Sequence, residues 1–317
     1  AQIASMNADE KIKIYTGFIG NSIFHSLVTS HNVTIAGRTT IDGYTSWKSV
    51  DFLKQNDWNA ILEDIELVVN AIGIIQGNFQ KVQTEAPIQL YTQCIEKGIK
   101  VVHISAIGAE KKDPPTTFLL SKKVTDTFLL QYDKAKIIYP SMVIGNLGKS
   151  SQFFVEIAQF PIIPLFQSRP LPFVHITQLS ALIKNIVDDF DTYPRQVFAV
   201  AQPESLENLL SALKGKKGRF IHVPISIFKF LFRLFPNASI GVFNRETLQM
   251  LELTNVDDYK PMFDAASNHV NPNKIIKSDV FPQLFALLSI SFIWVWSGIS
   301  SLISWDTSLN LMKELGT

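Results

Sequence analysis

The stretch at residues 101–122, VVHISAIGAEKKDPPTTFLLSK, decides the fold. It opens with an apolar run that predicts a buried strand ending at Ser105, and it continues through a loop into a helix that carries Lys122. Continuous apolar strands that alternate with helices are typical of parallel sheets covered on both faces. The stretch therefore predicts one strand–loop–helix unit of an α/β protein, with a serine at the carboxyl end of its strand.

The same alternation continues on both sides of this unit. Apolar runs predict strands at 11–15, 31–38, 65–71, 98–105 and 136–140. Helices are predicted from the turn at 16–20 through residue 29, and at 58–62, 87–98 and 121–131. This order predicts the α/β class, with a Rossmann-type doubly wound parallel sheet whose ligands lie at the carboxyl ends of the strands. After residue 148 prolines cluster, which predicts a smaller C-terminal lobe, with sheet elements returning after residue 170.

Composition narrows the class of protein. Apolar residues make up 46% of the 317 residues and charged residues 18%, which excludes a disordered chain. The net charge of +1 predicts no nucleic-acid partner. The single cysteine, Cys94, excludes an internal disulfide and fits a reducing compartment. It is either a reactive thiol or a small apolar residue on the helix at 87–98, and the usual behaviour of free cysteine favours the second reading.

The two ends of the chain carry further expectations. Residues 1–10 lack the pattern of a secretory signal, so we expect a disordered, tag-like N-terminus and a cytoplasmic protein. Residues 280–305 contain no charge and are long enough, as a helix, to span a hydrocarbon core of about 30 Å. This segment could associate with a membrane, and the protein would then lie at the inner face of that membrane. Alternatively, the segment is a buried hydrophobic helix or a dimer face. The apolar segment at 228–235, FKFLFRLF, could lie on a bilayer surface or cover the lobe.

The turn TGFIG follows the first predicted strand directly and opens a helix. A phosphate needs backbone N–H groups at a helix N-terminus, and glycines let the chain approach it closely. The other reading is an ordinary turn at a helix start, because a lone G-x-x-G is weak evidence. The candidate dinucleotide-binding residues of this turn are Thr16, Gly17, Phe18, Ile19 and Gly20.

Other candidate binding residues lie where predicted strands end. Arg38 follows the second strand, where a guanidinium suits the 2′-phosphate of NADP and an acidic residue would suit the ribose of NAD. The other reading of Arg38 is a surface arginine. The cofactor is thus expected to be NADP, or NAD. The remaining candidates are Ala71, Ile72, Gly73, Ser105, Lys122, Tyr139, Pro140, Ser141 and Met142.

Together these segments resemble the short-chain dehydrogenase/reductase superfamily, in which a strand-end serine precedes a tyrosine and a lysine on the next helix. Ser105 and Lys122 match the serine and the lysine, whereas Phe118 stands at the tyrosine position. The chain is most similar to the NAD-dependent epimerase/dehydratase and NmrA-like members, especially bacterial ones with a C-terminal DoxX-like segment. It is distantly similar to the related accessory subunit of respiratory complex I. The matching blocks include TGFIG, VVHISAIGA, SKKVTDTFL, YPSMVIG, PFVHITQL and FIWVWSGISSLIS.

The resemblance implies roles for these residues. Ser105 would polarise a substrate carbonyl and Lys122 would hold the nicotinamide ribose. Phe118 has no proton to give, so Tyr139 or water would supply the proton that follows the hydride. His175, in PFVHITQL, is expected to be structural, and Gln178 stands where relatives usually carry an acid.

Two functions remain open from the sequence. The first is an NAD(P)-dependent oxidoreductase, or an enzyme resembling sugar-nucleotide epimerases and dehydratases, that acts on an unknown small molecule without the usual tyrosine. The second is a non-catalytic nucleotide-binding protein, either a redox sensor or an accessory protein of a membrane complex. The resemblance divides the chain into an NAD(P)-binding domain at 11–148, a substrate-facing lobe at 149–278 and a hydrophobic, DoxX-like segment at 279–317. A homodimer is a further expectation.

Overall fold

The computed structural model describes residues 11–15, 17–38, 44–145, 149–165, 169–224, 258–272 and 280–303, together with the single residues 226, 233 and 314. Some of the predicted features lie outside these residues. They are the tag-like segment 1–10, Thr16 of the glycine turn, and the apolar segment 228–235 apart from residue 233.

Seven of the described strands form one parallel sheet, in the order β10-β6-β5-β4-β1-β2-β3. Their bounds are β1 (Lys11–Tyr15), β2 (Asn32–Gly37), β3 (Trp47–Ser49), β4 (Leu67–Asn70), β5 (Lys100–Ile104), β6 (Ala135–Pro140) and β10 (Gln196–Ala199). The direction of strand order reverses between β1 and β4, the position at which doubly wound sheets bind their ligands. This topology confirms the predicted Rossmann-type sheet.

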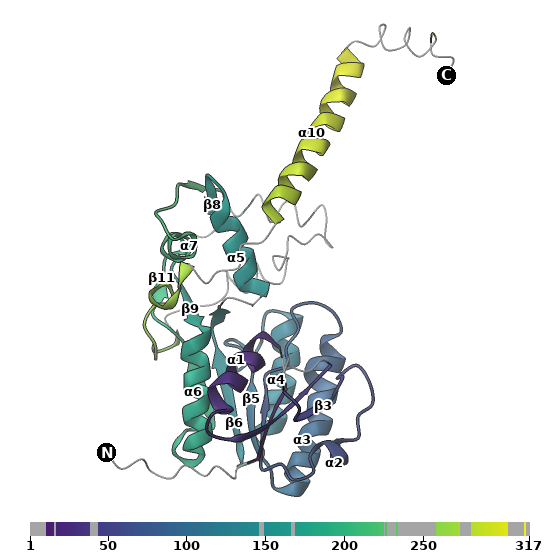
Figure 1. Ribbon diagram of the computed structural model, residues 1–317, viewed down its shortest axis with the longest axis vertical. Coiled ribbons are helices and arrows are strands. Elements are labelled where there is room, and N and C mark those ends of the chain that lie inside the picture. The colour runs from purple at the N-terminus through teal and green to yellow at the C-terminus, as the bar shows by residue number, and fades with distance from the viewer. Residues whose placement is uncertain are drawn as a thin grey trace.

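Helices cover both faces of the sheet (Figure 1). They are α1 (Phe18–Leu27), α2 (Trp58–Ile61), α3 (Ala86–Lys97), α4 (Thr117–Leu129) and α6 (Ile176–Asp188). α1 and α6 share one core, in which Ile23 and Ile183 are buried with Val69 of β4. α3 and α4 pack on the opposite face, where Leu90 and Cys94 are buried. Cys94 is 0% exposed, which agrees with its reading as a small apolar residue.

A smaller lobe packs at the carboxyl edge of the sheet (Figure 1). Its elements are β7 (Met142–Ile144), α5 (Lys149–Gln159), β8 (Ile163–Leu165), β9 (Leu171–His175), β11 (Pro203–Glu204), α7 (Leu206–Lys214), β12 (Phe220–His222) and the 3₁₀ turn η4 (Ala266–His269). Phe154, Phe173 and Leu209 lie in its separate core. A further 3₁₀ turn, η2 (Phe190–Thr192), follows α6 and belongs to the sheet unit.

Two helix starts differ from the sequence predictions. α4 begins at Thr117 instead of residue 121, because the Thr116 side chain accepts a hydrogen bond from the Leu119 N–H at 3.2 Å and caps the helix. α3 is preceded by a π-helical segment, η1 (Gln80–Glu85), and the two run on without a break. The apolar pattern marked the helix interiors, but it did not mark the cap at Thr116 or the polar π-helical segment.

The C-terminal helix α10 (Val280–Ile303) extends away from the rest of the protein (Figure 1). All the residues at 292–300 are exposed, and Trp294 retains 76% of its surface. The alternative of a buried helix is therefore wrong for this part of the segment. Among the residues that the structure describes, no helix combines the length and the apolar character needed to cross a membrane.

Candidate functional site

The start of α1 lies at the carboxyl edge of the sheet, next to the point where strand order reverses. Gly17 is the N-cap residue, has an extended backbone and is exposed. A Cβ on Gly17 would meet no atom of the described residues within 4 Å, so these residues leave the space beside this turn open. No described side chain caps the helix. A helix end with free N–H groups and open space is suited to bind an anion.

The residues that follow Gly17 in this turn are partly buried in the protein core. Gly20 is buried, and Phe18 and Ile19 are half-buried, with Ile19 packed against the core under α1. Arg38 is exposed directly after β2. Its place at the strand end agrees with the predicted position, and its surroundings at 39–43 lie outside the described residues.

Lys122 is buried where β4 and β5 end. Its Nζ donates to the carbonyl oxygens of Ile72, at 3.2 Å, and Ile104, at 2.9 Å. A Cβ on Gly73 would lie 3.7 Å from the same Nζ. Desolvation lowers the pKa of Lys122 to about 8, although the nearby Asp126 carboxylate acts in the opposite direction. The structure thus brings together four of the predicted residues: Ile72, Gly73, Ser105 and Lys122.

Ser105 is held by a residue that the sequence analysis did not single out. Its hydroxyl donates to Oδ2 of Asp126 at 2.6 Å, and both residues are buried. Asp126 lies one helical turn after Lys122 on α4, so the two side chains share the face that packs on the sheet. A carboxylate four residues after the lysine, on the same face of the predicted helix, is the signal that could have found it.

A chain of buried polar groups continues behind Asp126. The Nε2 atom of His103 lies 3.3 Å from Oδ1 of Asp126, and Nδ1 of His103 lies 2.6 Å from the Tyr91 hydroxyl. The Asn70 amide donates to that hydroxyl at 2.7 Å. Burial lowers the pKa of His103, which keeps the ring neutral near pH 7.

A second set of buried hydrogen bonds ties η1 to α4. Gln83 accepts from the Ile74 N–H at 3.3 Å and donates to the Ser121 hydroxyl at 2.9 Å. The Thr125 hydroxyl donates to the Gln83 carbonyl oxygen at 2.6 Å. The π-helical turn thereby fixes the loop after β4 beside Lys122, and π-helical turns are frequent at functional sites.

Phe118 and Tyr139 decide which group could give a proton. Phe118 packs edge-to-face on Phe79, with ring centroids 6.0 Å apart. Its side chain has no ionisable proton that it could donate to a substrate. Tyr139 is 0% exposed and stacks on Phe198. Its hydroxyl accepts from the Gln196 amide at 3.2 Å, and burial and the Asp126 carboxylate raise its pKa. Tyr139 therefore lies in the core instead of at the open edge.

The remaining predicted residues follow β4 and β6. Ala71 and Pro140 are buried, and Met142 is half-buried at the start of β7. Ser141 is buried, and its hydroxyl has no hydrogen-bond partner among the described residues. An unpaired buried hydroxyl at a strand end is a group that a ligand could satisfy.

His175 has the structural role that was expected. It caps α6, and the Gln178 side chain accepts from the His175 N–H at 2.9 Å, which completes a capping box. Gln178 also donates to Asp264 at 2.8 Å. Burial, and to a smaller extent the nearby His269, lowers the pKa of His175 to about 4.

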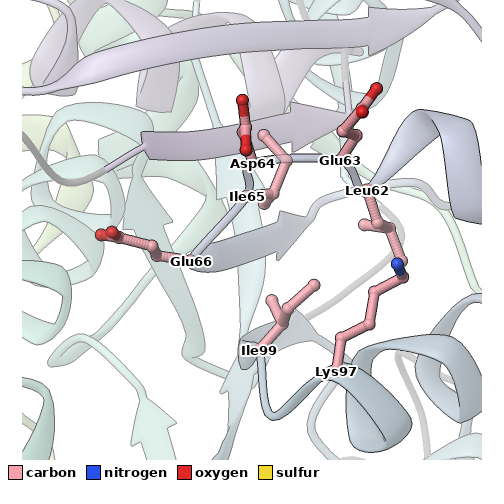
Figure 2. Close-up of a pocket in the computed structure, with 7 residues that line it drawn as sticks. All are labelled: Leu62, Glu63, Asp64, Ile65, Glu66, Lys97 and Ile99. Carbon is pink, nitrogen blue, oxygen red and sulfur yellow. The ribbon is translucent and has the colours of Figure 1, made fainter.

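A surface cavity of about 350 Å³ lies at the opposite edge of the sheet (Figure 2). It is lined by Leu62, Glu63, Asp64, Ile65, Glu66, Lys97 and Ile99, which precede β4 and β5. Because doubly wound sheets bind ligands at the carboxyl ends of their strands, this cavity is not the candidate site.

Comparisons with known proteins agree with this architecture. No family model matches the chain, and no curated protein sequence matches it. Among solved structures, a nucleoside-diphosphate-sugar epimerase from Staphylococcus aureus is similar with a TM-score of 0.59 and 14% identity, over 84% of this chain and 97% of that one. UDP-N-acetylglucosamine 4-epimerase from Bacillus cereus gives 0.55 and 16%, over 79% and 99%. MoeE5, solved with UDP-glucose and NAD, gives 0.53 and 13%, over 77% and 100%. At such identities the likeness establishes the fold.

Proposed function

We propose that this chain binds a nicotinamide dinucleotide, NADP or NAD, across the carboxyl edge of its parallel sheet and is an oxidoreductase of the epimerase/dehydratase type. The observation that carries the proposal is the meeting of Ser105 and Lys122 at the ends of β4 and β5. The open N-terminus of α1 lies on the other side of the reversal in strand order. Similar solved structures include sugar-nucleotide epimerases, and one was solved with NAD and UDP-glucose.

The residues present fit such a cofactor at both ends. Gly17 leaves open space beside the uncapped N-terminus of α1, which suits a pyrophosphate. At the other end, the buried Ser141 hydroxyl lacks a partner among the described residues. Arg38, exposed beyond β2, would favour NADP through the 2′-phosphate.

The cofactor and the residues of the site would have different roles in the reaction. When bound, the nicotinamide would supply or accept a hydride. Lys122, between two strand-end carbonyls, places a cation at this edge and would contact the ribose. Neither Phe118 nor the buried Tyr139 presents a proton to a ligand, so the proton that accompanies the hydride would come from water.

Titration of the protein with NADPH and NADH, followed by nicotinamide fluorescence, tests the proposal. We expect saturable binding of both, tighter for NADPH. Arg38→Ala should abolish the difference between the two nucleotides, because only NADPH carries the 2′-phosphate. Lys54→Ala, which removes an exposed lysine after β3, is the matched control and should leave the difference intact. Failure to bind either nucleotide at millimolar concentration would refute the proposal.

A non-catalytic nucleotide-binding role is the second candidate, and Phe118 favours it. A Phe118→Tyr variant can distinguish the two functions. The variant and the parent protein would each be incubated with UDP-glucose and NAD. If the variant forms NADH and the parent protein does not, the parent site lacks only the proton-donating tyrosine. Absence of turnover in both, with intact nucleotide binding, would favour the sensor or accessory role.

We also propose that α10 attaches the protein to a membrane surface. Phe292, Trp294 and Trp296 are each more than 60% exposed on this helix. Exposed aromatic and aliphatic groups of this kind partition into the headgroup region of a bilayer. Flotation with phosphatidylglycerol vesicles should recover the protein, and Trp294→Ser with Trp296→Ser should weaken recovery. The control variant Ile221→Ser changes an exposed apolar residue of the lobe and should leave recovery with the vesicles unchanged.

A further inference from the structure

We propose that Asp126 fixes Ser105 as a hydrogen-bond acceptor toward the ligand, so that Ser105 receives an N–H of the nicotinamide carboxamide instead of donating to a carbonyl. This inference rests on the proposed binding of a nicotinamide dinucleotide. It reverses the direction of the hydrogen bond that the family resemblance implies for Ser105, and it adds Asp126 as a positioning residue.

The direction follows from the number of protons at Ser105. A serine hydroxyl has one proton to donate and two lone pairs that accept. The Ser105 proton is directed to Oδ2 of Asp126 at 2.6 Å, a length typical of charge-assisted O–H···O⁻ bonds. An ionised carboxylate only accepts, so Asp126 cannot exchange roles with the serine. What Ser105 can still offer a ligand is a lone pair.

The surroundings of Asp126 hold this arrangement in place. Asp126 is 2% exposed, so no bulk water competes for its oxygens. The titratable groups that face it are Lys122 from α4, His103 from β5, Tyr139 from β6 and Tyr91 from α3. Lys122 is the cation among them, and it lies near the Asp126 carboxylate. Neutral His103 lies against the second oxygen, Oδ1, at 3.3 Å.

The carboxamide is the donor that fits the place of Ser105 in the sheet. A dinucleotide lies across the reversal in strand order, with one half on each side. Arg38 and the N-terminus of α1 belong to the adenosine side, with β1 and β2, so the nicotinamide half lies over β4, β5 and β6. Ser105 directly follows β5 and retains 5% of its surface, on the edge where that half would lie.

Two nucleotides that differ only at the carboxamide test the inference. In the 3-acetylpyridine analogue of NADP⁺ a methyl ketone replaces the carboxamide, so the carbonyl acceptor remains and the N–H donor is lost. Calorimetric titration should show the parent protein binding NADP⁺ about tenfold more tightly than the analogue, the size of one hydrogen bond whose acceptor would otherwise be unpaired. The ratio of the two affinities is the readout, because a general loss of folded protein affects both equally.

Two variants should remove the preference. In Asp126→Asn the amide can donate to Ser105, which frees the serine proton to donate to either nucleotide, so the ratio should fall toward one. In Ser105→Ala the acceptor is absent, and the ratio should fall in the same way. Glu204→Gln, which neutralises another buried carboxylate in β11, is the matched control and should keep the tenfold ratio.

The outcomes separate this inference from the proposed function. Equal binding of both nucleotides by the parent protein, or a preference for the ketone, would overturn the inference and leave nucleotide binding established. A ratio unchanged in both Asp126→Asn and Ser105→Ala would assign the preference to other residues and would also overturn it. A parent protein that binds neither nucleotide would overturn the proposed function itself.

Discussion

The buried ammonium of Lys122 links the stability of the protein to pH. The pKa of Lys122 is lowered from 10.5 in the unfolded chain to about 8 in the folded protein, first because of desolvation. Between these two values the unfolded state binds more protons than the folded state, so the contribution of Lys122 to the free energy of unfolding rises with pH. Below pH 8 the buried charge costs about 3 kcal/mol.

Lys122→Met should therefore change the pH dependence of stability. Urea unfolding followed by circular dichroism should show parent stability rising by about 3 kcal/mol relative to the variant from pH 8 to pH 10.5. The loss of a donor to the Ile72 and Ile104 carbonyls adds an offset that does not vary with pH. Lys112→Met, at an exposed lysine, is the control and should give a curve parallel to the parent. Parallel curves for Lys122→Met as well would contradict the prediction.

Cys94 should be inert in the folded protein. It is fully buried, and desolvation raises its pKa to about 12, so the reactive thiolate is scarce at pH 8. Dithionitrobenzoate should label native protein slowly, at the rate of opening, and label urea-unfolded protein at once. The chain has one cysteine, so the absorbance reports this site alone. Rapid labelling without denaturant would show that α3 opens easily.

The sequence singled out Ser105 and Lys122, through the family resemblance and their places at a strand end and on the following helix. It did not single out Asp126, which the structure places beside them. Asp126, His103 and Tyr91 are buried polar residues on three different elements, and which of them meet depends on how α3, α4 and β5 pack. For Tyr139, the position at a strand end was predicted correctly, but the environment of the side chain was not. Only the packed structure shows that its ring stacks on Phe198.

At the scale of elements, Gly145 joins β7, α1 and α6. A Cβ on Gly145 would lie 2.5 Å from Cγ2 of Ile176 and 2.9 Å from Cζ of Phe18. Gly145→Ala should therefore destabilise the protein by about 1–3 kcal/mol, the usual cost of overpacking. Thermal and urea unfolding measure this loss.

A double-mutant cycle tests the physical reason. Ile176→Ala removes Cγ2, so the double variant should be more stable than the sum of the single effects predicts, by about 0.5–3 kcal/mol. Gly17→Ala is the matched control, because a Cβ there meets open space and its extended backbone suits any residue. Strict additivity of Gly145→Ala and Ile176→Ala would show that the crowding is relieved elsewhere.

Strands were easier to predict than helix starts, for a physical reason. The strands β4 and β5 are buried on both faces, so their apolar runs mark them clearly in the sequence. The start of α4 is capped by Thr116, whose side chain accepts from the Leu119 N–H and whose carbonyl oxygen accepts from the Leu120 N–H. The π-helical turn η1 depends on tertiary hydrogen bonds of Gln83, which no local pattern encodes.

At the scale of the whole molecule, the doubly wound parallel sheet was predicted from the alternation of strands and helices, and the structure adds the order of its strands. That order places the reversal between β1 and β4 and brings the candidate residues to one edge. The apolar run at 280–305 was recognised from its composition, but composition does not say what a helix packs against. The structure shows the described residues at 292–300 exposed, so this helix depends little on the core.

The last prediction concerns this independence of α10. Trp294 is 76% exposed and Trp296 62%, so replacing both with serine removes no core contact and should change the free energy of unfolding by less than about 0.5 kcal/mol. Ile183→Ala, at a fully buried residue of α6, should instead cost about 2–5 kcal/mol through the cavity it leaves. Urea unfolding, monitored by circular dichroism in the absence of vesicles, measures both. A large loss of stability in the tryptophan variant would show that another copy of the chain covers α10 in solution, because the described residues of one molecule leave these side chains exposed. Dilution would then lower the stability of the parent protein, since the stability of an associated state depends on concentration.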